Sequence, residues 1–210
     1  NDYDRYNFSF RNTTNFLNNK FILDTSANYI IQNDKNMVSQ GQYFNPLTSL
    51  YLFPRGEDFS DVTVYERYDD LSGVNTQYWP YGDLGGVSSQ NPYWIMNRMN
   101  RENDRRRYKL AASLQYNIID GLNVQGRVSI DNTESKYTEK FHAGTVGNFA
   151  GSKGRYKEEN RLDRQVYADV LANFNKTFNE FNVTANLGAS IKDLRMELTS
   201  LHGDLNNVTN

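Results

Sequence analysis

The sequence predicts an all-β fold: antiparallel up-and-down hairpins that form part of a large transmembrane β-barrel. Three observations lead to this prediction. Apolar and polar residues alternate with a period of two over several long segments. These segments come in pairs joined by short turns, whereas long connections separate the pairs. The composition, with 15 Tyr and 12 Phe in 210 residues, is rich in residues that suit pleated, half-buried surfaces.

The first predicted hairpin opens the chain. Even positions from Tyr6 to Phe16 are mostly aromatic, and the odd positions between them are polar or charged. The run Asn18-Asn19-Lys20 marks a tight turn. From Phe21 to Ile31 the alternation continues, with the apolar residues now at odd positions. Both segments are therefore expected to be strands with one apolar and one polar face.

Two further hairpins are predicted in residues 108–130 and 166–191. In each of them, apolar and polar residues alternate on both sides of a turn. The dipeptide Asp120-Gly121 is a strong turn signal in the first, and the turn of the second lies near Thr177–Glu180. The chain is thus expected to contribute about six strands.

The long connections are predicted at about residues 33–105 and 132–160. Short turns at one end and long loops at the other are typical of outer-membrane barrels, whose long loops are extracellular. Several strands also reach the ~9–11 residues that are needed to cross a bilayer. Aromatic residues next to the short turns would form a girdle at one membrane interface; these are Phe16, Phe21, Tyr116, Phe174 and Phe181.

A soluble antiparallel sheet that packs on one side would show the same alternation. The negative mean hydropathy, −0.78, excludes neither class, because only every second residue of a barrel strand faces lipid. The charged faces favour a barrel, since the lumen of a large barrel is wet. Six strands alone would leave two open edges, which lipid does not tolerate. The membrane interpretation therefore makes residues 1–210 a partial barrel domain.

Composition argues against several functional classes. The net charge of −2 gives no reason to expect nucleic-acid binding. The absence of Cys excludes a disulfide framework and a thiolate metal site. His142 and His202 lie far apart in sequence and carry no catalytic signature, and the acidic residues near Glu57 lack the spacing of a calcium loop. We expect no enzymatic activity, no cofactor and no metal.

The first long connection contains the best candidates for contacts with a substrate or partner. Exposed Trp and Tyr can stack on sugar rings or enter a partner's pocket. The candidates are Tyr78, Trp79, Tyr81, Tyr93 and Trp94. The alternative is that these rings pack the loop on itself or on the barrel rim. The run Arg105–Arg107 has two interpretations as well: a site for acidic lipid groups or partner carboxylates, or a solvated strand entry.

A second set of candidates lies on the polar faces of the predicted strands. These charged side chains would face the lumen of a barrel, where they could pair with a plug. The set comprises Arg5, Arg11, Asp24, Lys109, Arg127, Asp131 and Asp169.

Several segments resemble a known family. Asn91-Pro92-Tyr93-Trp94, the polar run that follows it and the strand 108–118 are similar to a recurrent stretch of SusC/RagA-type outer-membrane proteins, in which such a motif ends a long outer loop. Residues 120–129 resemble that family's turn and Gly-Arg strand, and Phe141-His142-Ala143-Gly144-Thr145 resembles an outer-loop motif. The opening residues 6–11 also read like a strand of these barrels. The resemblance runs in order over about residues 6–191.

The resemblance implies a TonB-dependent importer in the outer membrane of a Gram-negative Bacteroidetes bacterium. Such a barrel has about 22 strands, encloses a plug that contacts the TonB complex, and is capped by a SusD-like surface lipoprotein. The implied cargo is a glycan, an oligosaccharide or a peptide. No plug is recognised in this chain; in the family's order it would precede Asn1. The alternatives are a porin-like or adhesin-like barrel without energy coupling, and a soluble secreted carbohydrate-binding β-protein.

Overall fold

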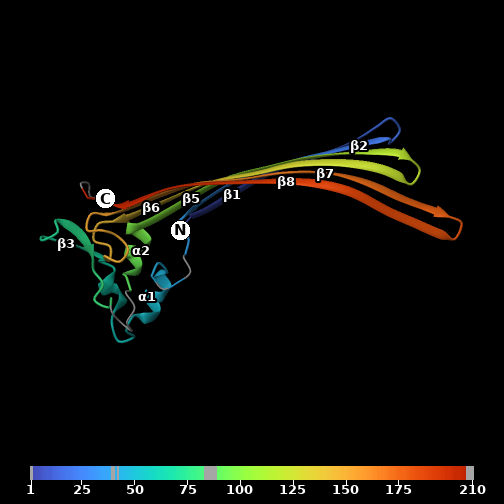
Figure 1. Cartoon of the computed structure of the whole chain (residues 1–210). Helices are drawn as coiled ribbons and strands as arrows, with labels where there is room; N and C mark the ends of the chain where they lie inside the picture. Colours follow the sequence, from blue (N-terminus) through green and yellow to red (C-terminus); the bar gives the residue numbers. More distant parts are fainter. Residues whose placement is uncertain (1, 39–40, 42, 83–88, 207–210) are drawn as a thin grey trace.

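A computed structural model describes residues 2–38, 41, 43–82 and 89–206, and it confirms the all-β, antiparallel fold. Six long strands form one sheet in the order β1-β2-β5-β6-β7-β8, so neighbours in sequence are neighbours in space. The strands are β1 (Asp2–Phe16), β2 (Phe21–Lys35), β5 (Met99–Ile119), β6 (Leu122–His142), β7 (Gly154–Phe178) and β8 (Phe181–Asp204). Figure 1 shows them as a single long, curved layer.

Three short turns lie together at one end of this layer (Figure 1). They join β1 to β2, β5 to β6 and β7 to β8, as the sequence predicted. Each turn contains a residue with a left-handed backbone, as at Asn18, Gly121 and Asn179. Asn and Gly adopt this conformation more readily than other residues, which explains why Asn-rich and Asp-Gly sequences mark the turns.

The strands extend further into the expected loops than predicted. The connections observed are residues 36–98 and 143–153, instead of about 33–105 and 132–160. In the added parts, polar and charged residues replace the apolar ones, so the alternation that marks a strand disappears. Cross-strand ion pairs accompany the pairing there: Lys35 lies 3.2 Å from Glu102, and Lys136 lies 3.3 Å from Glu158.

The register of the sheet creates two different faces. Paired residues of adjacent strands point the same way, and side chains alternate along each strand. One face, here called the polar face, carries all seven charged residues that the sequence placed on the polar side: Arg5, Arg11, Asp24, Lys109, Arg127, Asp131 and Asp169. The opposite, apolar face carries Tyr6, Phe8, Phe10, Tyr29, Leu110, Leu114, Val128, Val170, Leu187 and Ile191.

The apolar face has little protein cover. Leu187 and Ile191 on β8 are 78% and 72% exposed, and Phe8 on β1 is 61% exposed. The aromatic residues near the short turns belong to this face, where the rings of Phe21 and Tyr116 stack with centroids 4.5 Å apart. The sheet is thus held by its backbone ladder and cross-strand contacts, and it has no core of its own.

The protein core lies at the other end of the sheet. There, residues 36–98 form α1 (Pro46–Leu52), the 3₁₀ helix η1 (Phe59–Val62), the hairpin β3 (Glu66–Asp69) and β4 (Val74–Gln77), and α2 (Pro92–Arg98). We call the described parts of 36–98 and 143–153 the cap. Its core cluster contains Trp94, Ile95 and Ala150, together with the strand residues Met99 and Phe141.

The cap lies on the polar side of the sheet. Met99 and Phe141 are paired in the register, and strand alternation puts them on the same face as Lys109 and Asp131. The ring of Phe44 in the cap packs 5.7 Å from that of Phe141. Figure 1 shows the helices and the small hairpin on one side of the layer only. In the described part of the chain, no helix has the length and apolar character needed to span a membrane.

The turn at Gly121 should be sensitive to a side chain. Its φ is +82°, and a Cβ there would lie 2.5 Å from the carbonyl oxygen of Asn175. Gly121→Ala should therefore lower the free energy of unfolding by about 1–3 kcal/mol, measured by urea unfolding of the purified protein. Gly126→Ala is the control, because a Cβ at Gly126 meets no atom within 4 Å. Equal stability of the two variants would contradict this account of the turn.

Candidate functional site

Asn91 organises the cap around the start of α2. Its side-chain oxygen accepts a hydrogen bond from the backbone N–H of Tyr93 at 2.9 Å, which caps the helix, and Pro92 occupies the first helical position. The side-chain amide donates to the carbonyl oxygens of Val62 and Tyr78, each at 2.9 Å. Asn91 is fully buried. Through these hydrogen bonds, its side chain joins three segments of the cap.

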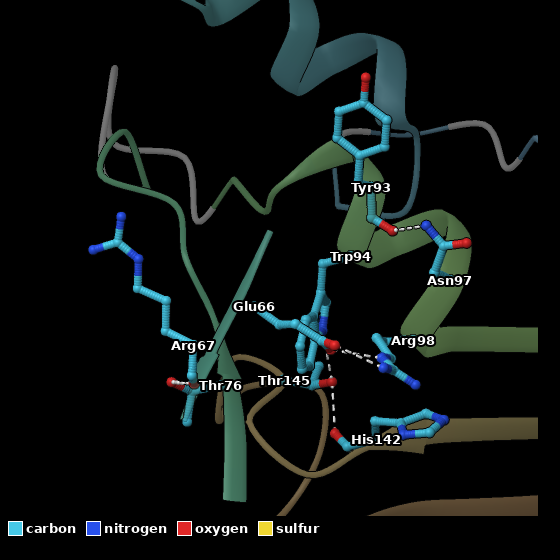
Figure 2. Close-up of polar contacts among 9 residues, drawn as sticks. All are labelled: Glu66, Arg67, Thr76, Tyr93, Trp94, Asn97, Arg98, His142 and Thr145. Atoms are coloured by element: carbon cyan, nitrogen blue, oxygen red, sulfur yellow. Dashed lines mark hydrogen bonds and ion pairs between the residues drawn. The ribbon is translucent and has the colours of Figure 1, made fainter. Parts of the chain in front are cut away.

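Trp94 fixes α2 to the second connection. Its indole Nε1 donates to the hydroxyl of Thr145 at 3.1 Å, and this hydroxyl donates to the carbonyl oxygen of His142 at 2.7 Å (Figure 2). The side chain is only 1% exposed. Trp94 was among the predicted contact residues, and the surface it keeps lines the cavity described below. Its role in this structure is to position the helix.

A salt bridge ties the small hairpin to the end of α2. Nε and Nη2 of Arg98 each donate to a carboxylate oxygen of Glu66 at 2.8 Å (Figure 2). These hydrogen bonds hold the pKa of Glu66 below its usual value, although partial burial opposes the shift. A cavity of about 370 Å³ adjoins the pair, and Tyr68, Asn75 and His142 contribute to its lining.

The four other predicted contact residues are half-buried and pack within the cap. The Trp79 indole donates to Ser89 Oγ at 2.8 Å, and its ring meets that of Tyr81 edge to face at 5.4 Å. The guanidinium of Arg67 lies over the ring of Tyr78, with its Cζ 3.3 Å from the ring centroid. These contacts agree with the alternative that the loop packs on itself, while each ring keeps part of its surface exposed.

Sequence reasoning missed the aromatic partners of these residues. Phe53 packs edge to face on Tyr81 with centroids 5.1 Å apart, and Tyr65 stacks on Tyr93 at 6.2 Å. Nothing local in the sequence links residues so far apart in the chain. The most exposed rings and apolar side chains of the cap were missed as well, among them Tyr51 at 85% and Leu71 at 99%.

The charged residues of the polar face form specific pairs. Arg11 and Asp24 lie 2.9 Å apart, as do Arg127 and Asp169. Asp131 accepts a hydrogen bond from Arg107 at 2.8 Å; the sequence singled out Arg107 in the run Arg105–Arg107 but did not place it in the lumen-facing set. Arg5 and Lys109 make no salt bridge within 4 Å to the residues that the structure describes. The structure therefore combines four of the seven predicted residues into two pairs.

Two acidic residues of the first connection, Asp58 and Asp69, accept hydrogen bonds from nearby backbone N–H groups. Asp58 accepts a hydrogen bond from the backbone N–H of Ser60 at 2.9 Å at the start of η1, and this bond lowers its pKa. Within the described ranges, no group of three or more His, Asp or Glu side chains is arranged to hold a metal ion.

The arrangement of strands and cap can be compared with known structures. The fold is similar to part of the RagAB peptide importer. Three structures of that importer match at 14% identity. The TM-score is 0.64 for the closed-closed state, 0.65 for the open-open state and 0.65 for the third structure. The match covers 98% of this chain but only 22% of the importer chain. No protein-family model matches the sequence, and no curated protein matches it.

The Glu66–Arg98 salt bridge should make docking of the small hairpin dependent on pH. Because the pKa of Glu66 is lowered in the folded cap, the pair stabilises docking above the ordinary carboxyl pKa, and this contribution is lost as the pH falls through the lowered value. Glu66→Gln should remove about 1 kcal/mol of docking free energy near neutral pH and flatten its acid dependence. Hydrogen exchange of residues 66–77 between pH 3 and 7 measures both effects.

Asp70→Asn is the matched control for this experiment. Asp70 lies exposed in the turn of the same hairpin and makes no salt bridge in the described part of the chain. Its replacement should leave the exchange profile unchanged. If Glu66→Gln behaved like this control, the salt bridge would not hold the hairpin in place.

Proposed function

We propose that this chain is a section of the wall of an outer-membrane β-barrel that belongs to a TonB-dependent importer of the SusC/RagA type. In this proposal the apolar face contacts lipid and the polar face lines the lumen. The free edges of β1 and β8 pair with further strands of a barrel of about 22 strands. The protein acts in transport, and the chain has no enzymatic role.

One observation carries the proposal: in the part of the sheet near the short turns, large apolar side chains cover one face of all six strands, and no described part of the chain packs over them. Water-soluble monomers rarely expose apolar patches of more than a few hundred Å². A bilayer provides the missing apolar surroundings, and charges on the opposite face are compatible with a wet lumen. Support also comes from the similarity of the fold to part of the RagAB peptide importer and from the segments that resemble, in order, motifs of the SusC/RagA family.

The cap is assigned to the outer mouth of the barrel. It extends from the strand ends opposite the short turns and lies on the polar side of the sheet (Figure 1), so it would project over the lumen. The connections 36–98 and 143–153 would then be extracellular. The exposed parts of Tyr78, Trp79, Tyr81 and Tyr93 would contact the cargo or a SusD-like surface lipoprotein, and Trp94 would hold α2 in position.

The polar face is assigned to contacts inside the barrel. A plug enclosed by the wall would meet the paired charges Arg11–Asp24 and Arg127–Asp169, and the unpaired Arg5 and Lys109, while TonB acts through that plug. The cargo is a peptide, a glycan or an oligosaccharide. Peptide has the support of the fold comparison, since the similar importer carries peptides.

The size and location of the native polypeptide test this proposal first. Cells of the source organism are fractionated and probed with an antibody against this segment. We expect an outer-membrane band several times larger than 24.3 kDa whose mobility shifts on heating. A lipoprotein that copurifies would support the SusD-like partner. A soluble band near 24.3 kDa would contradict the barrel.

Two adjacent alanines on β5 test which face contacts lipid. Ala112 pairs with Thr25 and Val128 on the apolar face, whereas Ala111 pairs with Ser26 and Ser129 on the polar face. Ala112→Arg should destabilise the barrel by about 2–4 kcal/mol, because it exposes a charge to the bilayer interior. Ala111→Arg should be tolerated in a wet lumen. The heat-modifiable fraction of each full-length variant in membranes measures the difference, and the reverse order would reject this orientation.

A further inference from the structure

A polar hollow lies on the polar face between the cap and the middle of the sheet. Its volume is about 500 Å³, and we define it by Arg105, Thr133, Ser135, Tyr137 and Arg161, which line it. Arg105 lies on β5, six residues along the strand from Met99, which belongs to the core of the cap. The hollow is large enough for one or two residues of a peptide or sugar chain, and it offers hydroxyl groups next to a guanidinium.

The three consecutive arginines of β5 have different surroundings. Arg106 lies on the face opposite to the hollow, because alternate residues of a strand point to opposite sides. Arg107 points to the polar face and donates to Asp131 at 2.8 Å. Arg105 also points to the polar face, but its Nε donates to the neutral hydroxyl of Ser135 at 3.3 Å. Arg105 forms no salt bridge with a carboxylate in the described part of the chain.

The carboxylates that line the hollow already have cationic partners. Asp163 accepts hydrogen bonds from Arg161 at 2.7 and 3.0 Å. Glu159 lies 3.0 Å from Nζ of Lys157. Arg105 is therefore the arginine of this lining that has no carboxylate partner, and its terminal nitrogens make no hydrogen bond within the described ranges.

A second unpaired arginine lies in the same row of the sheet. Arg5 pairs in the register with Gln32, and Gln32 pairs with Arg105. Two strand spacings of ~4.8 Å separate the backbones of the two arginines by about 10 Å. Arg5 also forms no salt bridge with a described residue. The row thus presents two guanidinium groups at a distance that neighbouring acidic groups of one extended oligomer can span.

We propose that Arg105, in the polar hollow, binds a carboxylate of the transported cargo, so that the importer favours acidic oligomers. This inference rests on the proposed function, in which the polar face lines the import path. A guanidinium presents parallel N–H donors that match the two oxygens of a carboxylate. The hydroxyl groups of Thr133 and Ser135 lie in the same hollow for further hydrogen bonds. The chemistry fits the acidic side chains of a peptide and the carboxylates of a uronic-acid oligosaccharide equally well.

Binding to the full-length importer, purified in detergent, tests the inference. The probes are a fluorescent pentapeptide with two Glu, the same peptide with two Gln, and a labelled galacturonate oligomer. The variants are Arg105→Gln and, as the matched control on the opposite face, Arg106→Gln. We expect wild type to bind at least one of the two acidic probes, the Glu peptide or the galacturonate oligomer, more tightly than the uncharged Gln peptide. Arg105→Gln should bind the favoured acidic probe about tenfold more weakly and the Gln peptide as before.

The acidic probe that binds Arg105→Gln more weakly than wild type shows whether the cargo carboxylate comes from a peptide or from a uronic-acid oligosaccharide. Arg106→Gln should bind all three probes like wild type. The inference is overturned if both arginine variants lose affinity equally, or if Arg105→Gln weakens the Glu and Gln peptides equally, as expected if this arginine holds a plug instead of cargo. It is also overturned if wild type binds the Gln peptide as tightly as both acidic probes, a result that leaves the proposed importer intact. Binding of none of the probes to wild type would count against the importer as well.

Discussion

A sheet of six long strands without a protein layer over its apolar face is the constraint on which the rest of the structure depends. The strands are joined by continuous backbone hydrogen bonding, and this ladder satisfies the polar groups of the main chain along every interior strand. Apolar side chains such as Leu187 stay exposed, so the sheet gains little from burial inside this chain. In the proposed barrel, a bilayer would cover this face and supply the apolar surroundings that the chain itself lacks.

The cap follows different physical rules. It is the part of the molecule where side chains from distant segments converge on a buried cluster, and buried polar groups connect its pieces. Asn91 joins three segments, and Trp94 reaches Thr145, which lies 51 residues further along the chain. Because a buried polar group without its partner costs more than a typical hydrogen bond contributes, these contacts select one arrangement of the cap. The cap is thereby fixed to the strand ends on the polar side of the sheet.

Most arginines singled out on the polar face of the sheet are paired with aspartates of the neighbouring strand. On the polar face, three Arg–Asp pairs join adjacent strands. Exposed pairs of this kind contribute little to stability. Arg105, like Arg5 and Lys109, forms no salt bridge with a described carboxylate, and of the three it lies nearest to the core of the cap on β5.

The sequence by itself determined the six strands, their turns and the face of the seven charged residues of the lumen-facing set, because the period of two and the Asn and Gly turn residues are local properties of the chain. It did not determine where the strands end: in residues 99–107 and 131–142 charged side chains replace apolar ones, and only cross-strand pairing keeps these parts extended. Nor could it separate Arg105 from Arg107, since their difference lies in Asp131 on the neighbouring strand. The burial of Trp94 was likewise decided by tertiary structure alone, because its partners come from another connection, and only the folded chain brings them together.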